Sequence, residues 1–459
     1  MARPFRSRSG PAAPAPGTRH RPARASAIFY ASAGGAAVGD TTTAGVPLPL
    51  DDAARAVAKA LFLRPEPLCP ECRGRVLGRL GHGFTNPERA RLTAQALGLE
   101  PPLPLDPPDR CEVCAGAFSR IPKWVERCLN SAEGWEWSSF RCGSRFDPER
   151  LAREEALWVD VGSAWGESLR AAFNRELGKA ISAATGKRGD VDPPDLVFLA
   201  DVPVGLASIT VSPIFFYGRY RKLDRTLPQT RWPCRSCRGK GCSRCAGTGK
   251  MYAESVEEVV GGPLLALSGG SSHAFHGMGR EDIDARMLGR GRPFVLEVSR
   301  PKKRGLPMEE ALRAISEKGV GRVEVQDLRP CEGSEVERVK AARPEKTYRV
   351  VIAPAFPEAK LNEVRTVVEN HPLEQRTPTR VAHRRADLRR LRTVKSVRFV
   401  ASDAESSTLE VRAEAGTYIK EFVEGDGGRT QPNLAALLGT PLKVRALDVL
   451  EVHDGPEVA

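Results

Sequence analysis

The chain has 459 residues, enough for two or three domains, and 41 % of them are hydrophobic, enough for ordinary cores. No stretch approaches the roughly eighteen apolar residues that a membrane helix needs, which excludes an integral helical membrane protein. The formal net charge of +13 favours a polyanionic partner, nucleic acid before a membrane surface, because neutralised phosphates release their counterions. Many basic proteins bind no nucleic acid, so charge alone does not decide the function.

Residues 1–45 are rich in Arg, Ala, Pro, Ser and Gly, and six arginines precede the first acidic residue, Asp40. This composition buries too little apolar surface to offset the entropy of ordering the chain. An Arg-rich start without acids is also typical of an organelle transit peptide. We expect a disordered basic tail, or a reading frame that starts upstream of the folded protein, and a cytoplasmic location.

Residues 46–125 are expected to form a zinc-knuckle region with two short helices. Asp51–Leu63 is amphipathic, and a second helix begins near Asn86, with Asn86 or Thr85 at its N-cap. Two C-x-x-C pairs, 38 residues apart, lie in this region: Cys69 with Cys72, and Cys111 with Cys114. If the pairs meet they form a four-cysteine zinc site; the alternative is two unrelated pairs.

Residues 126–216 are predicted to form an α/β module. One segment has an apolar residue every four positions, which indicates a helix with one apolar face: Trp165, Leu169, Phe173, Leu177 and Ile181. Leu196–Leu199 and Leu206–Val211 are short apolar runs on either side of a turn, as in paired strands. A helix packed on a small sheet is the simplest assembly of these elements.

Residues 217–459 are predicted to form one larger α+β domain. We expect a strand at Val295–Val298 and a helix at Pro307–Lys318 that ends at Gly319. Further strands are indicated by alternating or apolar runs: around Val323 and Val325, at Tyr348–Ile352, at Thr393–Val400 and at Thr408–Ala413.

A double C-x-x-C-x-G-x-G unit lies at the start of this domain and contains Cys234, Cys237, Cys242 and Cys245. Two residues between thiolates let one turn present both sulfurs to one metal, and the glycines permit positive φ angles. Four thiolates make a closed tetrahedral site, so we expect structural zinc rather than catalysis. Redox chemistry is the alternative.

The segment 371–400 contains nine Lys or Arg residues and two acids, a local net charge of +7. His383–Arg392 carries much of this charge, as about three helical turns or an extended arm. A solvated basic face is the usual reading of such a run, but its density here favours contacts with phosphates.

A weaker pattern, LSGGSSH at Leu267–His273, resembles the SGGxDS phosphate loop of ATP-dependent enzymes that activate an RNA base for thiolation. The acidic residue of that loop is missing, because Ser272 stands in its place. Glycine pairs are also common in ordinary turns, so an ATP-dependent thiolase is kept only as an alternative.

The stretch GREDIDARMLGRGRPF, from Gly279 to Phe294, mixes three acids with four arginines. Surface ion pairs of little individual worth are one interpretation. The other is a carboxylate that neighbouring arginines keep ionised and ready for nucleophilic attack.

This stretch and several further blocks resemble the archaeal tRNA pseudouridine(54/55) synthase family. Gly279–Asp282 fits the G-R-x-D pattern around the catalytic aspartate of pseudouridine synthases. The other blocks are found in order along the chain: Cys69–Arg75, His82–Ala90, Gly218–Leu223, Pro228–Cys234, the double knuckle, Tyr252–Glu258, Lys346–Tyr348, Arg376–Asp387 and Gly416–Lys420. The resemblance covers roughly residues 60–455.

The resemblance implies a fold and a reaction. The fold is a pseudouridine synthase catalytic domain around a curved mixed or antiparallel sheet, with a zinc-containing accessory region that includes a THUMP-type RNA-binding module. The reaction isomerises uridines 54 and 55 in the T-loop of tRNA, without an organic cofactor, a membrane or an obligate protein partner. It detaches uracil from C1′, turns it and rejoins it through C5.

The resemblance also assigns roles to residues. Asp282 is the nucleophile, attacking either C1′ of the ribose or C6 of the base, and Asp284 is the runner-up, expected as a structural partner of Arg280 or Arg286. Arg280 and Lys346 are further expected substrate contacts. Tyr348 matches the ring that stacks on the target base, Tyr418 matches a second substrate contact, and Lys420 stands where many pseudouridine synthases carry an arginine that pairs with the aspartate. A non-catalytic, zinc-dependent tRNA-binding or chaperone protein is the alternative from another class.

Overall fold

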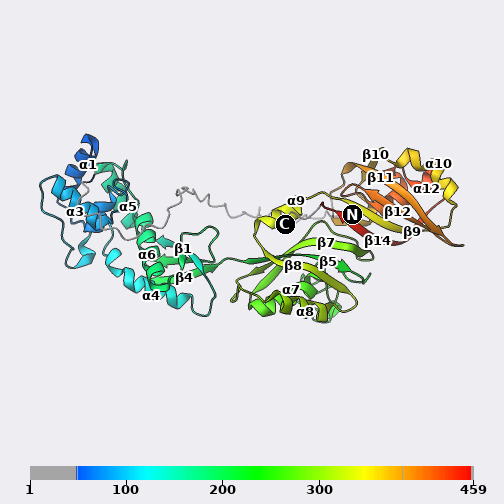
Figure 1. The fold of residues 1–459 in the computed structure, drawn as a ribbon, viewed down its shortest axis with the longest axis horizontal. Helices are drawn as coiled ribbons and strands as arrows, with labels where there is room; N and C mark the ends of the chain where they lie inside the picture. The colour runs from blue at the N-terminus through cyan, green and yellow to red at the C-terminus, as the bar shows by residue number, and fades with distance from the viewer. Residues whose placement is uncertain (1–47, 49, 385, 456–459) are drawn as a thin grey trace, which may run out of the picture. The chain divides into compact units, whose positions relative to one another are not determined.

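The computed structural model describes residues 48, 50–384 and 386–455, so the tail predicted at residues 1–45 lies outside the described residues. Among the helices in these ranges, none has the length and apolar character needed to span a bilayer. The described elements group into an N-terminal region with a small sheet and a C-terminal region with a large one (Figure 1).

The first and third helices are capped by side chains, as their sequences indicate. Asp51 accepts a hydrogen bond from the Ala54 amide at the start of α1 (Asp52–Phe62). Thr85, rather than Asn86, is the N-cap of α3 (Asn86–Ala96), and it forms a reciprocal capping box with Glu88. Between them lies α2 (Pro70–Arg75), which begins directly after Cys69.

A four-stranded sheet with the order β2-β1-β3-β4 follows. Its strands are β1 (Ser139–Arg145), β2 (Arg188–Gly189), β3 (Leu196–Asp201) and β4 (Leu206–Val211); its helices are α4 (Ile121–Ser131), α5 (Pro148–Val161) and α6 (Leu169–Thr185). The predicted hairpin of β3 and β4 is confirmed, with Leu196 opposite Val211. Helix α6 buries Leu169, Phe173, Leu177 and Ile181 completely, which confirms the predicted apolar face.

The C-terminal region is built on one ten-stranded sheet, in which β6 pairs with β7 beside the path β13-β10-β11-β12-β9-β14-β7-β5-β8. The strands are β5 (Ile214–Lys222), β6 (Ser272–Gly277), β7 (Arg286–Ser299), β8 (Val323–Cys331), β9 (Glu345–Ala353), β10 (Pro372–Arg376), β11 (Arg389–Ser402), β12 (Ser407–Ala413), β13 (Thr430–Gln431) and β14 (Lys443–His453). All strands predicted for this region are present.

Strand β14 joins the two halves of this sheet. It pairs antiparallel with β9, where Val449 lies opposite Tyr348, and parallel with β7, where Asp448 lies opposite Arg286. That parallel pair makes the sheet mixed, as predicted. The side chains of both halves belong to one hydrophobic core, in which Leu296 and Val350 are fully buried.

Helices cover this sheet from both halves. Helices α7 (Val256–Ser268) and α8 (Met308–Gly319) lie against β5, β7 and β8 in Figure 1. The remaining helices of this region are α9 (Ser334–Ala341), α10 (Glu358–Val368), α11 (Ile419–Glu424) and α12 (Leu434–Leu437). It also contains short 3-10 turns at Ser243–Cys245, Thr379–Arg384 and Asp426–Gly428, and the N-terminal region has two more, at Pro108–Arg110 and Phe118–Arg120. The predicted helix at Pro307–Lys318 is therefore confirmed, shifted by one residue.

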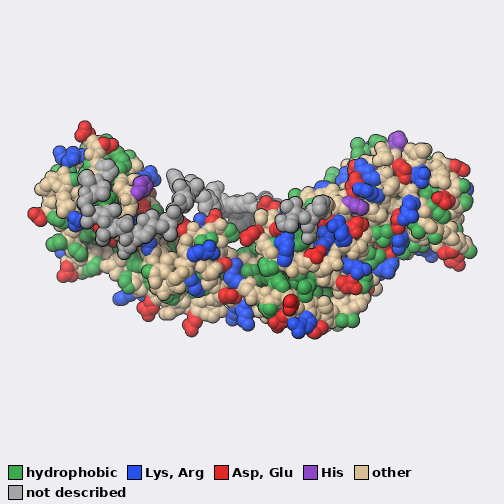
Figure 2. Space-filling model, viewed as in Figure 1, with side chains coloured by type: hydrophobic (Ala, Val, Ile, Leu, Met, Phe, Trp, Pro, Cys, Tyr) green, Lys and Arg blue, Asp and Glu red, His purple; other side chains and the backbone are tan. Residues whose placement is uncertain are grey.

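The basic segment 371–400 contains no long helix in its described part. It forms β10, the 3-10 turn Thr379–Arg384 and β11. Part of its excess charge is neutralised by acids outside the segment: Arg380 pairs with Glu421 at 2.7 Å, and Lys395 pairs with Glu414 at 3.2 Å. Figure 2 shows basic side chains interspersed with acidic ones on the face that it presents, rather than a continuous basic surface.

Candidate active site and metal centres

The loop between β6 and β7 carries Asp282. Gly279 opens this loop with a φ of +74°, a conformation that favours glycine. The Ala285 amide donates a hydrogen bond to the Asp282 carbonyl at 3.1 Å, which closes a tight turn around the aspartate. Asp282, the last residue of the G-R-x-D motif, is therefore the first residue of a tight turn between β6 and β7.

A buried ion pair anchors this loop. Glu281 and Arg292 are each about 1 % exposed, and Arg292 Nε lies 3.0 Å from Glu281 Oε2. The Tyr220 hydroxyl donates to Glu281 at 2.8 Å, and Arg292 also donates to the Met278 carbonyl at 2.7 Å. Charges this deeply buried are stable only when paired and hydrogen-bonded, so the network fixes the backbone on both sides of Arg280.

Lys222 holds the other side of the same loop. Its fully buried ammonium donates to the carbonyls of Ile283 at 2.8 Å and Asp282 at 3.2 Å. Burial is the main cause that lowers the pKa of this lysine, which the charge of Glu281 opposes. The backbone of Asp282 is thus fixed by a side chain from β5, while its carboxylate stays free to face a pocket.

The Asp282 carboxylate lies between two cations. Arg380 Nη1 is 2.9 Å from Oδ1, and Lys420 Nζ is 3.9 Å from Oδ2. Arg380 is itself held by Glu421, with Nε 2.7 Å from Oε1 of that buried carboxylate. The carboxylate of the predicted nucleophile is therefore held by two cations that come from two other elements of the domain.

Asp284 is placed differently. Its side chain is 67 % exposed, compared with 29 % for Asp282. Burial tends to raise the pKa of Asp284, but the hydrogen bond from Lys420 at 2.7 Å and the charges of Lys420 and Arg380 act against burial, and the pKa is lowered overall. The prediction that Asp284 pairs with Arg286 is wrong, because Arg286 pairs with Asp448 at 2.7 Å.

All six residues expected at the active site line one pocket of about 560 Å³: Arg280, Asp282, Lys346, Tyr348, Tyr418 and Lys420. The pocket is bounded by the β6–β7 loop, β9, the 3-10 turn Thr379–Arg384 and the start of α11. Arg380, Arg390 and Arg392 of the basic segment also reach it. The motifs are therefore assembled around one cavity, although they are spread over some 140 residues of the sequence.

Lys346 and Tyr348 reach the pocket from the same face of β9, because side chains two residues apart in a strand point the same way. Burial, together with smaller effects of the nearby charges of Arg292 and Arg343, lowers the pKa of Lys346 to about 8. Burial raises the pKa of Tyr348 to about 12, so its ring is neutral. The strand thus presents a flat neutral ring beside a titratable cation.

Tyr418 and Lys420 are positioned by the start of α11. The buried side chain of Gln375 on β10 accepts from the Tyr418 amide at 2.8 Å and donates to its carbonyl at 2.9 Å. This pair of bonds fixes the backbone at Tyr418, so that its ring and the Lys420 ammonium face the Asp282 loop.

Arg380 and Glu421 were not predicted from the sequence. Arg380 belongs to the block Arg376–Asp387, but nothing in that block indicates which of its arginines reaches a carboxylate 98 residues earlier. The arginines beside Asp282 serve other partners: Arg292 pairs with Glu281, and Arg290 with Glu451 at 3.0 Å. The expectation that arginines of this stretch pair with Asp282 is therefore wrong for Arg290 and Arg292.

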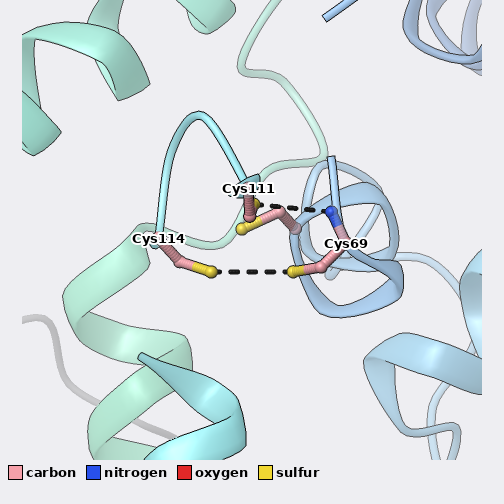
Figure 3. Close-up of side chains that lie close together, drawn as sticks. Cys69, Cys111 and Cys114 are labelled. Carbon is pink, nitrogen blue, oxygen red and sulfur yellow. Dashed lines mark hydrogen bonds between the residues drawn. The ribbon is translucent and has the colours of Figure 1, made fainter. Parts of the chain in front are cut away.

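The first two C-x-x-C pairs meet in space. The sulfurs of Cys69, Cys72, Cys111 and Cys114 all lie within 4.8 Å of one another, and Cys69 and Cys114 are 3.6 Å apart (Figure 3). The Cys69 amide also donates to the Cys111 sulfur at 3.4 Å. The alternative of two unrelated pairs is therefore wrong.

The double knuckle brings together the second set: Cys234, Cys237, Cys242 and Cys245. The amides of Gly241 and Gly249 donate to the sulfurs of Cys237 and Cys245, each at 3.2 Å. A Cβ on Gly241 would lie 2.6 Å from the Gly247 carbonyl, and one on Gly249 only 2.4 Å from the Gly239 carbonyl. The glycines are needed because the two turns contact each other through their backbones.

Both sulfur sets fit a tetrahedral metal. Four thiolates at about 2.3 Å from zinc lie about 3.8 Å from one another. Three pairs of sulfurs in the second set match this distance: Cys234 and Cys242 at 3.9 Å, Cys237 and Cys245 at 3.8 Å, and Cys242 and Cys245 at 3.7 Å. Two four-cysteine groups that could each bind a metal ion are therefore present.

The LSGGSSH segment does not resemble a phosphate loop in its position. Gly269 caps the C-terminus of α7 in a left-handed conformation, and Ser272 begins β6. Phosphate loops use the N-terminus of a helix, where amides and the helix dipole attract anions. The glycine pair here is a helix-ending turn, which removes the basis of the ATP-dependent alternative.

The comparisons with known proteins identify the chain as a pseudouridine synthase. A family model described as "Pus10, C-terminal" matches residues 215–453, and one described as "Pus10 THUMP domain, archaeal" matches residues 124–201. The chain therefore belongs to the Pus10 family, which confirms the resemblance found in its motifs.

Curated relatives align with most of the chain. The protein named tRNA pseudouridine synthase Pus10 from Methanothrix thermoacetophila is 39 % identical over 424 residues, which are 86 % of this chain and 94 % of the relative. The one from Pyrococcus furiosus is 36 % identical over 398 residues, 86 % of this chain and 97 % of the relative. Among solved structures, one chain of a Cbf5–Nop10–Gar1 complex aligns with 51 % of this chain and 48 % of its own, at 18 % identity and a TM-score of 0.28, too low to carry an argument.

Proposed function

We propose that this pseudouridine synthase acts on tRNA and isomerises uridines 54 and 55 of the T-loop, with Asp282 as its nucleophile. The observation that carries the proposal is the position of Asp282 between Arg380 and Lys420, in the pocket that Tyr348 also lines. The names of the relatives supply the tRNA, and the family resemblance supplies the two positions.

The reaction needs few groups from the protein. Asp282 attacks C1′ of the ribose or C6 of the uracil, and the N1–C1′ bond breaks. The base turns and rejoins C1′ through C5, and the bond to the Asp282 carboxylate breaks again, which frees the aspartate. The proton lost from C5 is balanced by one gained at N1. Tyr348 holds the extruded uracil by stacking, which offsets part of the few kcal/mol that unstacking costs. Arg380 and Lys420 hold the Asp282 carboxylate in position until the base arrives.

The remaining predicted residues hold the rest of the nucleotide. Tyr418 provides a second substrate contact at the start of α11, while Arg280 and Lys346 contact phosphates beside the extruded uridine. We keep residues 46–125, 126–216 and 217–459 as the proposed zinc-knuckle, THUMP-type and catalytic domains, and the cytoplasm as the proposed location.

The proposal is tested with a T-arm hairpin transcript and the purified protein, followed by mapping of pseudouridine at each loop position. We expect conversion at positions 54 and 55 without ATP or any organic cofactor. A protein that binds the transcript without changing any uridine would instead be the non-catalytic tRNA-binding protein considered as the alternative.

The two cysteine groups are proposed to hold structural zinc. Each set offers four sulfurs and no open ligand position, so the metal would stabilise the fold and supply no step of the reaction. We expect about two zinc ions per chain by elemental analysis, and about one in Cys242→Ser. A count of zero zinc ions in the native protein would contradict both sites. A count of one would contradict one of them, and cysteine variants of the occupied site would then lower the zinc content.

Lys346 predicts a dependence of RNA affinity on pH. Its pKa of about 8 means that the ammonium is charged near pH 7 and becomes neutral as the pH rises through 8. Affinity for the T-arm should therefore fall between about pH 7 and pH 9, and the salt dependence of binding should weaken by about one phosphate contact. Bound phosphate favours the charged form and moves this loss toward higher pH.

Lys346→Met should show the weaker affinity already near pH 7 and change less with pH. Binding measured by fluorescence anisotropy, at several salt concentrations, checks both expectations. The same pH profile in the native protein and in Lys346→Met would assign the titration to another group.

A further inference from the structure

Two aromatic residues stand at the two ends of the double-knuckle loop. Trp232 precedes the first cysteine of the loop and Tyr252 follows its last glycine turn. The loop is closed by a β-bridge between Pro233 and Lys250, and the Met251 amide donates to the Trp232 carbonyl at 2.9 Å. As a result the two rings meet edge to face, with centroids 5.8 Å apart and planes at 89°.

These rings face the active-site pocket. Trp232 and Tyr252 both line it, together with Arg280 and Asp282. The Arg280 guanidinium lies over the Trp232 ring, 5.7 Å from its centroid. Both rings are only half-buried, so they leave aromatic surface beside the reacting nucleotide.

The base of the loop is tied to α7, so the rings have little freedom to move. The Arg231 amide donates to the Glu257 carboxylate at 3.0 Å, and Lys250 pairs with Glu258. Glu257 and Glu258 are both in the first turn of α7, which packs on the domain core. The chain on both sides of the loop is therefore attached to α7, at Arg231 and at Lys250, and this fixes Trp232 beside the pocket.

We propose that Trp232, with Tyr252 and Arg280, forms an aromatic wall that stacks on an unpaired base next to the target uridine. This inference rests on the proposed function. Tyr348 already serves the target base, and a second ring on another wall of the same pocket suits a neighbouring base that the T-loop leaves unstacked. Aromatic rings stack on any base, and an arginine beside a ring also meets the flanking phosphate.

The four-cysteine group gains a role on this view. The four cysteines lie in the loop between Trp232 and Tyr252, so a bound metal would keep the two rings in a fixed position relative to Asp282. The double knuckle would thus position part of the substrate site without any contact between metal and substrate.

The inference is tested by RNA binding in an Asp282→Asn background, which removes turnover from the measurement. We expect Trp232→Ala to weaken binding of the T-arm hairpin roughly five- to a hundredfold, the range for loss of one stacked base. Trp232→Phe should keep most of the affinity, because it keeps a ring. Met251→Ala is the matched control, because its exposed side chain belongs to the same loop but is not among those that line the pocket, and it should bind as the parent does.

The partner base is found with hairpins that each carry one abasic nucleotide in the loop. When the abasic nucleotide replaces the base that stacks on Trp232, the parent and Trp232→Ala should bind the hairpin with equal affinity. When it replaces any other base of the loop, the parent should still bind more tightly than Trp232→Ala. Equal affinity of the parent and Trp232→Ala for the complete hairpin would overturn the proposal. So would equal losses in Trp232→Ala and Trp232→Phe with a lower metal content, since the ring would then only close the knuckle.

Failure of this inference is distinguishable from failure of the proposed function. Turnover by the protein with native Asp282 and Trp232 tests the function, because it depends on conversion of a uridine. If that protein converts uridine but Trp232→Ala binds the hairpin normally, the aromatic wall is wrong and the function stands.

Discussion

Replacing Asp282 by asparagine should lower the rate of pseudouridine formation by about four orders of magnitude or more, the scale seen when an enzyme loses its nucleophile. The amide has nearly the same shape, so the pocket should persist. Arg380 and Lys420 lose an anionic partner, and T-arm affinity should stay within a few-fold of the native value or become tighter. Single-turnover assays and anisotropy measure the two effects separately.

Asp284→Asn is the matched control for this experiment. It lies two residues away and has the same chemistry, but its carboxylate is 67 % exposed and paired with Lys420. An exposed ion pair is worth less than about 1 kcal/mol, so we expect less than a tenfold change in rate. Activity that persists in Asp282→Asn would contradict the assignment, and loss in Asp284→Asn alone would move the nucleophile to that residue.

Replacing Arg292 by methionine should lower the free energy of unfolding by about 3–5 kcal/mol. This is the cost of removing one partner of a buried ion pair, because the other charge is left uncompensated. Glu281 would keep only the Tyr220 hydroxyl and the Lys222 ammonium at 4.0 Å. Urea unfolding, followed by a signal from the catalytic domain, measures the loss.

Two further variants separate charge from packing. The double variant Glu281→Gln with Arg292→Met removes both charges and should recover much of the stability. Tyr220→Phe removes one hydroxyl and should cost only about 1–3 kcal/mol, as the loss of one partner of a buried group does. If Arg292→Met alone proved as stable as the native protein, the buried pair would not be what anchors the Asp282 loop.

The local elements were predictable where one periodicity dominated. Helix α6 follows from apolar residues four positions apart, but Trp165 lies before the helix. The reason is that the Ser168 side chain accepts from the Ala171 amide at 3.2 Å and caps the helix at Leu169. The apolar spacing continues through Trp165, whereas the capping bond sets the boundary.

The conformation of the basic segment could not be predicted in the same way. His383–Arg392 has a composition that suits a helix or an arm, and the structure places its last residues in β11. Pairing with β10 and β12 decides this, for example between Arg392 and Leu373. Such pairing depends on residues distant in sequence, which no local pattern reveals.

The active site was predictable as a set of motifs but not as a set of contacts. The G-R-x-D turn and the K-x-Y spacing identified Asp282 and Tyr348, and both line the pocket. The contact between Arg380 and Asp282 could not be predicted, because it depends on how the tertiary fold places β10 and α11. Glu421 of α11 fixes the direction of the Arg380 side chain. Motifs identify chemical groups, whereas the sheet register decides which charges meet.

The position of β14 has a consequence for synthesis of the protein. This strand lies between β9 and β7, yet it follows every other described element in the sequence. Leu447 and Val449 on it line the pocket. A ribosome that has made the accessory region and nine strands of the large sheet therefore holds a nascent chain with two unjoined half-sheets. Domains fold as they emerge, so the RNA-binding accessory region can form early, while catalysis must wait for β14 and incomplete chains remain inactive.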